Sequence, residues 1–179
     1  ENLNKEQTKL LEQTYKYFVR GGANSSQEDQ KKLSELNSKI AILQVNFGQN
    51  MLKETNAYKL IIENEEDLAG LPENLIAMGA ETAKQDSMPG KWIFTLHNPS
   101  IMPFLQYAEN RDLREQIFKA YINRGNNGNE NDNTQVCADL VATRLAKAQL
   151  MGYNNYAEFV LETRMAKTAD AVYKLLEDV

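Results

Sequence analysis

Apolar residues recur at helical spacing at the start of the chain and predict two successive helices. The first apolar stripe consists of Leu3, Leu10, Leu11, Phe18 and Val19. It ends at Arg20, and the two glycines that follow are a common helix exit. The apolar seam of the second helix alternates spacings of three and four residues over Leu33, Leu36, Ile40, Leu43 and Phe47.

The second helix has its own start signal and a limited apolar seam. Ser25 followed by Glu28 is the pattern of a capping box. A helix over residues 27–53 is roughly 40 Å long at about 1.5 Å per residue. Its seam covers about two heptads, whereas about three to four heptads indicate a coiled coil. We therefore expect residues 1–55 to form an antiparallel helical hairpin rather than an intermolecular coiled coil.

Two short stretches alternate between apolar and polar residues, as half-buried strands do. Their apolar positions are Tyr58, Leu60 and Ile62 in the first stretch, and Trp92, Phe94 and Leu96 in the second. Between them lie a turn and a helix, with Pro72 suited to the first helical turn. Residues 56–98 are thus predicted to form a strand–helix–strand segment.

The remaining segments have helical patterns. Two short helices are predicted to bury Met102, Leu105, Tyr107 and Ala108, and then Leu113, Ile117, Ala120 and Tyr121. The last apolar face stops without a capping signal, so we expect residues 99–179 to be a helical subdomain that continues in a longer protein. The predicted fold class is mainly α: one multi-helix lobe over residues 1–179 with a long helical hairpin and a small two-stranded β element.

Composition narrows the possible partners. The chain has 20 Lys and Arg against 25 Asp and Glu, a net charge of −5, which argues against a nucleic-acid partner. No apolar run approaches the length of about 20 residues that crosses a bilayer, so no membrane partner is expected. The single cysteine, Cys137, excludes an internal disulfide. These features favour the cytoplasm, with the periplasm as the alternative.

The chain has one histidine, His97, within the stretch TLHNPSIMPF. A catalytic zinc takes three protein ligands, commonly from His-Glu-x-x-His and a third residue, and this chain has no such motif. Asn98 or Ser100 would cap the next helix, with Pro99 fixing the turn. We therefore interpret His97 as part of a strand-to-helix turn and assign no catalytic or metal-binding residue in this chain.

Two other features resemble reactive or metal-binding sites. Cys137 falls in an apolar helical stripe, and we expect a buried, inert thiol because no activating neighbour is close in sequence. Residues 123–133, NRGNNGNENDN, are rich in oxygen ligands but lack the acidic spacing of an EF-hand. We expect a solvated loop whose Asn and Asp side chains cap the following helix.

Three ordered blocks resemble the peptidyl-dipeptidase branch of the thimet oligopeptidase family, which are zinc metallopeptidases. They are LAGLPENLI at 68–76, GKWIFTLHNPSIMPFLQYAENRDLREQIFKAYINRG at 90–125 and RLAKAQLMGYNNYAEFVLETRMAKT at 144–168. The resemblance spans essentially the whole chain. It implies a helical, neurolysin-like peptidase of two lobes around a deep channel, with the zinc motif in a C-terminal half that follows this chain.

The resemblance therefore implies a non-catalytic N-terminal portion of a peptidase that removes C-terminal dipeptides from oligopeptides. Zinc would belong to the whole protein and its catalytic lobe, and the isolated chain would be inactive. A dipeptide-releasing enzyme must hold a terminal carboxylate, and paired donors suit that task. The candidates here are Tyr107, Arg111, Arg114 and Arg124, although solvated helix faces are the favoured explanation of these residues. The alternatives are an endo-oligopeptidase fragment, an inactive homologue, or a self-standing adaptor that binds a partner helix along the seam.

Overall fold

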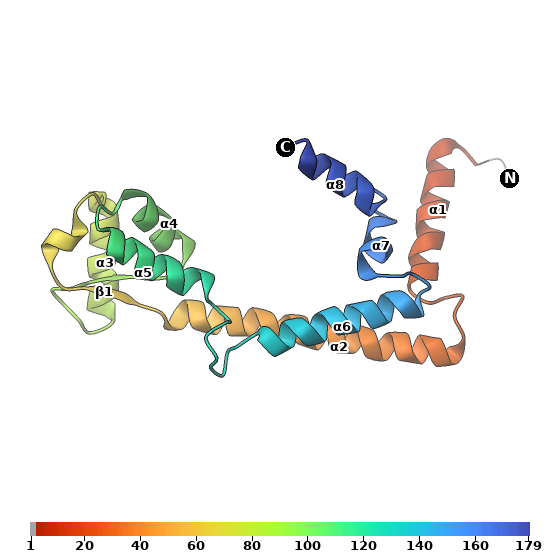
Figure 1. The fold of residues 1–179 in the computed structure, drawn as a ribbon, viewed down its shortest axis with the longest axis horizontal. Helices are drawn as coiled ribbons and strands as arrows, with labels where there is room; N and C mark the ends of the chain where they lie inside the picture. The colour runs from red at the N-terminus through yellow and green to blue at the C-terminus, as the bar shows by residue number, and fades with distance from the viewer. Residues whose placement is uncertain (1–2) are drawn as a thin grey trace. The chain divides into compact units, whose positions relative to one another are not determined.

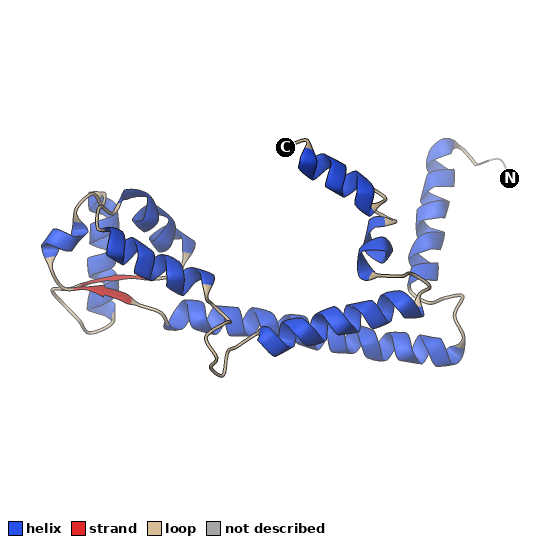
Figure 2. Cartoon of the chain, viewed as in Figure 1, coloured by secondary structure: helices blue, strands red, loops and turns tan. Residues whose placement is uncertain are grey.

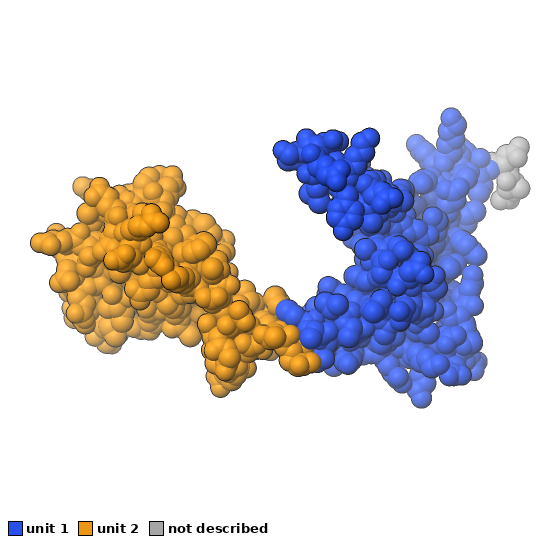
Figure 3. Space-filling model, in the orientation of Figure 1, with its two compact units in different colours: residues 1–45, 137–179 blue, residues 46–136 orange. Residues whose placement is uncertain are grey.

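The computed structural model describes residues 3–179, which fold into helices and one small sheet (Figures 1 and 2). The chain forms two compact units (Figure 3). The first comprises the chain up to Val45 together with Cys137–Val179, and the second is Asn46–Val136. The predicted strand–helix–strand segment, 56–98, lies within the second unit. Among residues 3–179, none of the helices combines the length and apolar character needed to span a bilayer.

The elements of the second unit surround a small apolar core. They are the C-terminal part of α2 (Gln27–Ala57), β1 (Leu60–Ile62), the 3-10 helix η1 (Glu65–Leu68), α3 (Glu73–Gln85), β2 (Trp92–Phe94), α4 (Asn98–Tyr107) and α5 (Arg111–Ile122). The core side chains are Leu60, Ile62, Leu68, Leu71, Leu75, Phe94, Leu96, Ile101, Phe104, Ala108 and Ile117. Most of the predicted apolar positions of both strands therefore do face a core.

The sheet of the second unit confirms the predicted β element. β1 and β2 pair antiparallel, with Leu60 opposite Phe94 and Ile62 opposite Trp92. α3 packs against β2 at Gly79, where an added Cβ would lie 3.0 Å from Cζ of Phe94. The Phe94 ring also contacts Phe104, with ring centroids 4.7 Å apart. The Phe94 ring of β2 thus contacts both α3 and α4.

The first unit consists of α1 (Lys5–Arg20), the start of α2, most of α6 (Thr134–Leu150), α7 (Tyr156–Leu161) and α8 (Ala169–Glu177). α1 begins at Asn4, whose side chain accepts a hydrogen bond from the Gln7 N–H in a complete capping box. α2 has 31 residues, about 46 Å at 1.5 Å per residue. The long second helix predicted from the seam is therefore confirmed.

The start of α2 differs by one residue from the prediction. Ser26, not Ser25, lies next to the helix, and its Oγ accepts a hydrogen bond from the Asp29 N–H at 3.1 Å. The sequence SSQED contains two overlapping serine-to-acid spacings. Both satisfy the capping pattern, so the pattern identified the cap only to within one residue.

The seam on α2 faces α6 rather than α1, which corrects the expected hairpin pairing. Leu36 lines a shallow groove with Ala146 and Leu150 of α6. Lys147 Nζ donates to Asn37 Oδ1 at 2.7 Å beside this groove. α1 runs at a steep angle to α2 (Figure 1) and has no buried residue in the part of the chain that is described. Spacing defines an apolar face, but it does not specify which helix covers that face.

The short helix α4 forms as predicted, but only part of its predicted apolar face is buried: Ala108 is buried and Leu105 packs against the core. Ile101, Phe104 and Ala108 are buried, whereas Met102 and Tyr107 are 46% and 45% exposed. The segment is apolar on several sides, so more than one set of positions fits helical spacing. Packing against the strands selects the face that contains Phe104.

Candidate functional site

The histidine turn connects the end of α2 with the β2–α4 junction. The two ring nitrogens of His97 lie 3.1 Å from Thr95 Oγ1 and 3.1 Å from Asn56 Oδ1. Both partners are neutral, so no carboxylate orients the ring as a general base would require. His97 itself occupies the cap position of α4 without a side-chain cap bond.

The predicted caps of α4 are therefore wrong. Asn98 is already the first residue of the helix, and Pro99 follows it. The Ser100 hydroxyl instead accepts a hydrogen bond from the Thr95 N–H at 3.0 Å. Ser100 is buried, and its bond connects the chain that leaves β2 to the first turn of the helix. The polar residues of this stretch thus hold the turn together.

A buried carboxylate in the second unit anchors the asparagine-rich loop, and the sequence did not reveal it. Glu54 on α2 is 8% exposed. Its carboxylate accepts hydrogen bonds from the Gly125 N–H and from the side-chain amides of Asn127 and Asn129, each at 2.7 Å. The loop, which was predicted to be solvated, is therefore fixed to α2.

The surroundings of Glu54 keep it ionised. Burial alone would raise its pKa, but the hydrogen bonds from Gly125, Asn129 and Asn127 outweigh burial, so the pKa lies below its usual value. A carboxylate in this state accepts hydrogen bonds and does not serve as a proton donor near neutral pH. The arrangement supports a structural anchor rather than an acid catalyst.

The loop also caps the next helix, as predicted. Asp132 Oδ1 accepts a hydrogen bond from the Thr134 N–H at 2.8 Å. The following residue, Asn133, is 3% exposed. Its side chain accepts from Asn50 Nδ2 at 3.0 Å and donates to the Phe47 carbonyl at 3.2 Å. The loop is thus also attached to α2 at Phe47 and Asn50, which precede Glu54 on that helix.

A pocket of about 340 Å³ lies where this loop meets α2 and α5. Its lining residues are Glu54, Ala57, Tyr58, Leu96, Ala120, Arg124, Asn127, Asn129 and Asn131. Two buried atoms of this lining, Tyr58 Oη and Asn131 Oδ1, have no hydrogen-bond partner among the described residues. The pocket itself is lined by small apolar side chains and by polar side chains of the loop.

A second polar cluster joins α1 to the region around α7 in the first unit. The Arg20 guanidinium donates to the Phe159 carbonyl at 2.6 Å and pairs with the Glu162 carboxylate. Its central carbon lies 4.0 Å from the centroid of the Phe159 ring. Tyr153 Oη donates to Glu162 Oε2 at 2.6 Å. Arg20 thus occupies the centre of a compact clamp.

The pKa values of Glu162 and Tyr153 in this clamp are shifted further from neutral pH. The Tyr153 hydrogen bond lowers the pKa of Glu162, burial opposes the shift, and Arg20 adds to it. Burial, followed by the Glu162 hydrogen bond, raises the pKa of Tyr153. A general acid or base works best with a pKa near the operating pH, so this pair is suited to holding α7 rather than to proton transfer.

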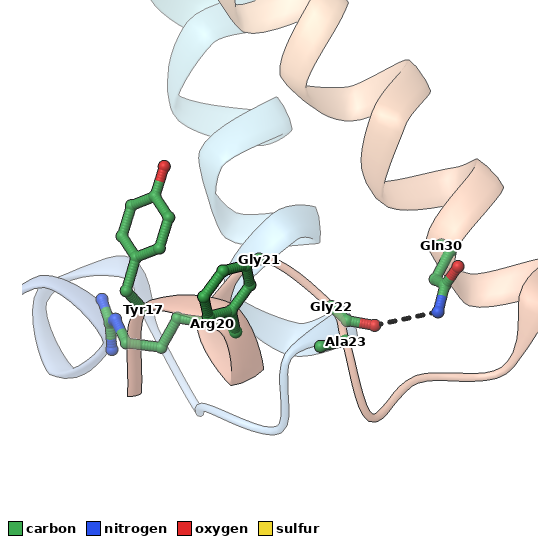
Figure 4. Close-up of a pocket in the computed structure, with 7 residues that line it drawn as sticks. Tyr17, Arg20, Gly21, Gly22, Ala23 and Gln30 are labelled. Carbon is green, nitrogen blue, oxygen red and sulfur yellow. Dashed lines mark hydrogen bonds between the residues drawn. The ribbon is translucent and has the colours of Figure 1, made fainter. Parts of the chain in front are cut away.

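The pocket next to Arg20 has about 490 Å³ and lies at the turn between α1 and α2 (Figure 4). Gln30 reaches from α2 to the Gly22 carbonyl at 3.2 Å. The lining residues are Tyr17, Phe18, Arg20, Gly21, Gly22, Ala23 and Gln30. This set contains neither an imidazole nor a carboxylate, so it offers no acid–base pair.

The four predicted carboxylate-binding candidates do not converge. Arg111 opens α5 and Arg124 follows its end, a separation of about 20 Å along the helix. Arg124 donates to Thr55 Oγ1 at 2.8 Å and to the Tyr121 carbonyl at 2.9 Å. Its central carbon lies 3.8 Å from the centroid of the Tyr121 ring. These three interactions engage the Arg124 guanidinium within the fold.

The other three candidates lie near the α4–α5 turn. The Arg114 guanidinium donates to the carbonyls of Ala108 and Glu109. The side chains of Tyr107 and Arg111 are exposed. Arg114 therefore closes the end of α4, while Tyr107 and Arg111 can reach an external ligand.

The predicted burial of Cys137 is wrong. Cys137 is exposed on α6, because the apolar positions of this helix do not form one continuous buried stripe. In the region that the structure describes, no three His, Cys, Asp or Glu side chains group closely enough to hold a metal ion. We therefore assign no zinc ligand among the described residues, and the expectation that this chain binds no catalytic zinc stays a prediction.

Comparison with known proteins shows that this chain is similar to peptidases. Residues 104–179 match the profile of peptidase family M3. Oligopeptidase A of Haemophilus influenzae is 34% identical over 175 residues, which cover 96% of this chain and 26% of that protein. Dipeptidyl carboxypeptidase of Escherichia coli is 32% identical over 177 residues, covering 99% of this chain and 26% of that protein.

A plant protein extends the same similarity. The probable cytosolic oligopeptidase A of Arabidopsis thaliana is 32% identical over 184 residues, covering 98% of this chain and 26% of that protein. The chain thus spans about a quarter of the length of the relatives it matches. These findings support the resemblance to the thimet oligopeptidase family: the chain is similar to M3 peptidases over nearly all of its length.

Proposed function

We propose that this chain is a non-catalytic portion of a zinc metallopeptidase that acts on oligopeptides. The observation that carries the proposal is the similarity of nearly the whole chain to about a quarter of several peptidases. The zinc ligands and the catalytic base would come from the rest of the protein, in a second lobe across a substrate channel. The described residues would contribute packed helices to the wall of such a channel, which admits extended peptides and excludes folded proteins.

The test of this proposal compares two proteins. The full-length protein should hydrolyse unstructured peptides and lose that activity when a chelator removes its metal. The 179-residue chain, dialysed and assayed for metal, should hold no stoichiometric zinc and cleave no peptide, because one histidine cannot build the needed set of ligands. Zinc that is retained by the chain and lost on His97→Ala would overturn this assignment.

We propose removal of dipeptides from free C-termini as the specific reaction. The support is the similarity to dipeptidyl carboxypeptidases of two bacteria, at 32% and 30% identity. Such a reaction requires a carboxylate-binding group about two residues beyond the cleaved bond, so that the distance to the C-terminus selects that bond. Tyr107 and Arg111, whose side chains are exposed, are the candidates in this chain.

The corresponding assay uses one peptide as the free acid and as its C-terminal amide, with products identified by mass spectrometry. Stepwise loss of two residues, much faster from the free acid, supports the proposal. Arg111→Ala should then slow the free acid selectively, with Lys119→Ala on the same helix as the control. A variant that slows both peptides equally contradicts a role for Arg111 in carboxylate binding.

An endo-oligopeptidase is the second candidate, because oligopeptidase A of Haemophilus influenzae is 34% identical to this chain. Equal internal cleavage of the free acid and the amide would favour it. For either activity we propose the cytoplasm as the location, with the periplasm as the alternative. One relative is named as cytosolic, and fractionation of cells that express the full-length protein tests this assignment.

A further inference from the structure

The asparagine-rich loop contains the sequence Asn127–Gly128, the only Asn-Gly pair in the chain. We propose that Asn127 is a site of spontaneous deamidation, and that its conversion to aspartate or isoaspartate detaches this part of the loop from Glu54. The reaction needs water and no other co-reactant. It is also independent of the proposed peptidase activity, because no residue of a catalytic centre takes part in it.

The reaction begins at the backbone nitrogen of Gly128, which attacks Cγ of the Asn127 side chain. The N–Cγ bond forms and the Cγ–Nδ2 bond breaks, so Nδ2 leaves as ammonia with the proton that the Gly128 nitrogen gives up. Water then opens the resulting cyclic imide: its hydroxyl adds to one carbonyl carbon and its proton returns to the nitrogen. Opening at the side-chain carbonyl gives aspartate, and opening at the backbone carbonyl gives isoaspartate.

The position of this pair in the fold favours ring closure. Asn127 and Gly128 are both exposed, so water reaches them. Gly128 has no side chain to obstruct the approach of its nitrogen to Cγ, and an added Cβ there would meet nothing within 4 Å. Residues 126–129 belong to neither a helix nor a strand, so no regular backbone ladder has to break when this segment rearranges.

The folded loop nevertheless engages both reacting groups. Asn127 Nδ2 donates to Glu54 Oε2 at 2.7 Å, and the Gly128 N–H donates to Asp132 Oδ2 at 2.8 Å. Glu54 holds the side chain that is attacked, while the negative charge of Asp132 opposes loss of the Gly128 proton. The reaction therefore proceeds through local opening of the loop, and the intact Glu54 anchor slows it.

Conversion of Asn127 turns its attraction to Glu54 into repulsion. The side-chain amide of Asn127 donates to a carboxylate that is 8% exposed, whereas an ionised carboxylate in its place can only accept. The lost donor is also one of those that hold the pKa of Glu54 below its usual value. Isoaspartate adds one carbon atom to the main chain as well. The modified residue therefore leaves Glu54, and the loop loosens at this point.

The first experiment locates deamidation in the folded 179-residue chain. The protein is kept in mildly alkaline buffer, and the tryptic peptide of residues 125–144 is sequenced by electron-transfer fragmentation, which distinguishes aspartate from isoaspartate. We expect Asn127 to undergo the amide-to-acid mass change before its exposed neighbour Asn126 does. Equal or faster conversion of Asn126 overturns the proposal. So does an unconverted Asn127 over a period in which the synthetic peptide of residues 125–144 reacts.

Two variants test the ring closure and the protection by Glu54. Gly128→Asn keeps a residue that tolerates the left-handed backbone at φ +63° but places a side chain beside the attacking nitrogen, so conversion of Asn127 should be lost. Glu54→Ala should speed conversion about tenfold by freeing the Asn127 side chain. Glu63→Ala, an exposed carboxylate of the same unit, is the control. Equal rates in the two alanine variants overturn the link between the anchor and the reaction.

A product mimic tests the structural consequence directly. Asn127→Asp places a carboxylate opposite Glu54, whereas Asn126→Asp places the same additional charge on the neighbouring exposed residue. The urea midpoint of the second unit, followed by the fluorescence of Trp92, should be lower in Asn127→Asp than in Asn126→Asp. An equal or higher midpoint in Asn127→Asp overturns the proposed detachment of the loop.

Discussion

Replacement of Glu54 by alanine should destabilise the second unit by about 2–4 kcal/mol. The estimate starts from the three hydrogen bonds that the carboxylate accepts. Gly125 is buried, so its N–H would be left unpaired, and a hydrogen bond to a charged group contributes about 1.5–3 kcal/mol. Asn127 and Asn129 are exposed, so their amides would return to water at a smaller cost. Glu54→Gln keeps one acceptor oxygen and should fall between wild type and Glu54→Ala.

The single tryptophan makes this measurement specific. Trp92 lies on β2 within the second unit, so urea denaturation followed by its fluorescence reports on the unit that contains Glu54. Helical circular dichroism follows both units in the same samples. Glu63→Ala, an exposed carboxylate of the second unit that pairs with Lys91, is the control and should change the midpoint little. A Glu54→Ala midpoint equal to that of Glu63→Ala would refute the anchor.

The pH dependence gives an independent test of the same reasoning. The pKa of Glu54 is lower in the folded protein than its usual value of 4.5, so the folded state binds fewer protons than the unfolded state. Its contribution to stability is therefore complete above about pH 4.5 and is lost as the pH falls through the folded-state pKa. Wild type should lose more stability than Glu54→Gln as the pH falls from about 5 to about 3. Identical losses would contradict the lowered pKa.

Three further substitutions and one chemical reaction test other parts of the fold. Gly79→Ala should destabilise the second unit, as followed by Trp92 fluorescence, because the new Cβ would lie 3.0 Å from the buried Phe94 ring. At Gly48 an added Cβ meets nothing within 4 Å, so Gly48→Ala should instead stabilise the protein by about 0.5–1 kcal/mol. Arg20→Ala should cost about 2–4 kcal/mol and speed hydrogen exchange in α7; unchanged exchange there would argue against the clamp. Cys137 should react with a thiol reagent in the native protein nearly as fast as in urea, and strong native protection would contradict its exposure.

The elements that depend on local pattern could be predicted from the sequence. Alternation of apolar residues located both strands, and their register pairs Leu60 with Phe94. Proline and glycine marked several of the boundaries between helices. These signals depend only on neighbours within about one helical turn or one strand, so they can be interpreted without knowledge of the rest of the fold.

The pairing of helices could not be predicted in this way. The seam on α2 meets α6, where Lys147 bonds to Asn37 across 110 positions of sequence. The α1 stripe, which is closer in sequence, remains exposed at Leu10 and Leu11. Periodicity indicates that one face of a helix is apolar. Which helix covers that face depends on which helices the loops bring together.

The asparagine-rich loop shows why the candidate sites were also missed. Its composition suggests cation ligands, since a cation binds the oxygen end of an asparagine side chain. In the fold, Asn127 and Asn129 present their nitrogen ends to a carboxylate that lies 73 and 75 positions away. The acid itself, Glu54, sits in a polar helical stretch where nothing distinguishes it from a surface residue. The side-chain amides that composition suggests as cation ligands therefore anchor the loop to α2 instead.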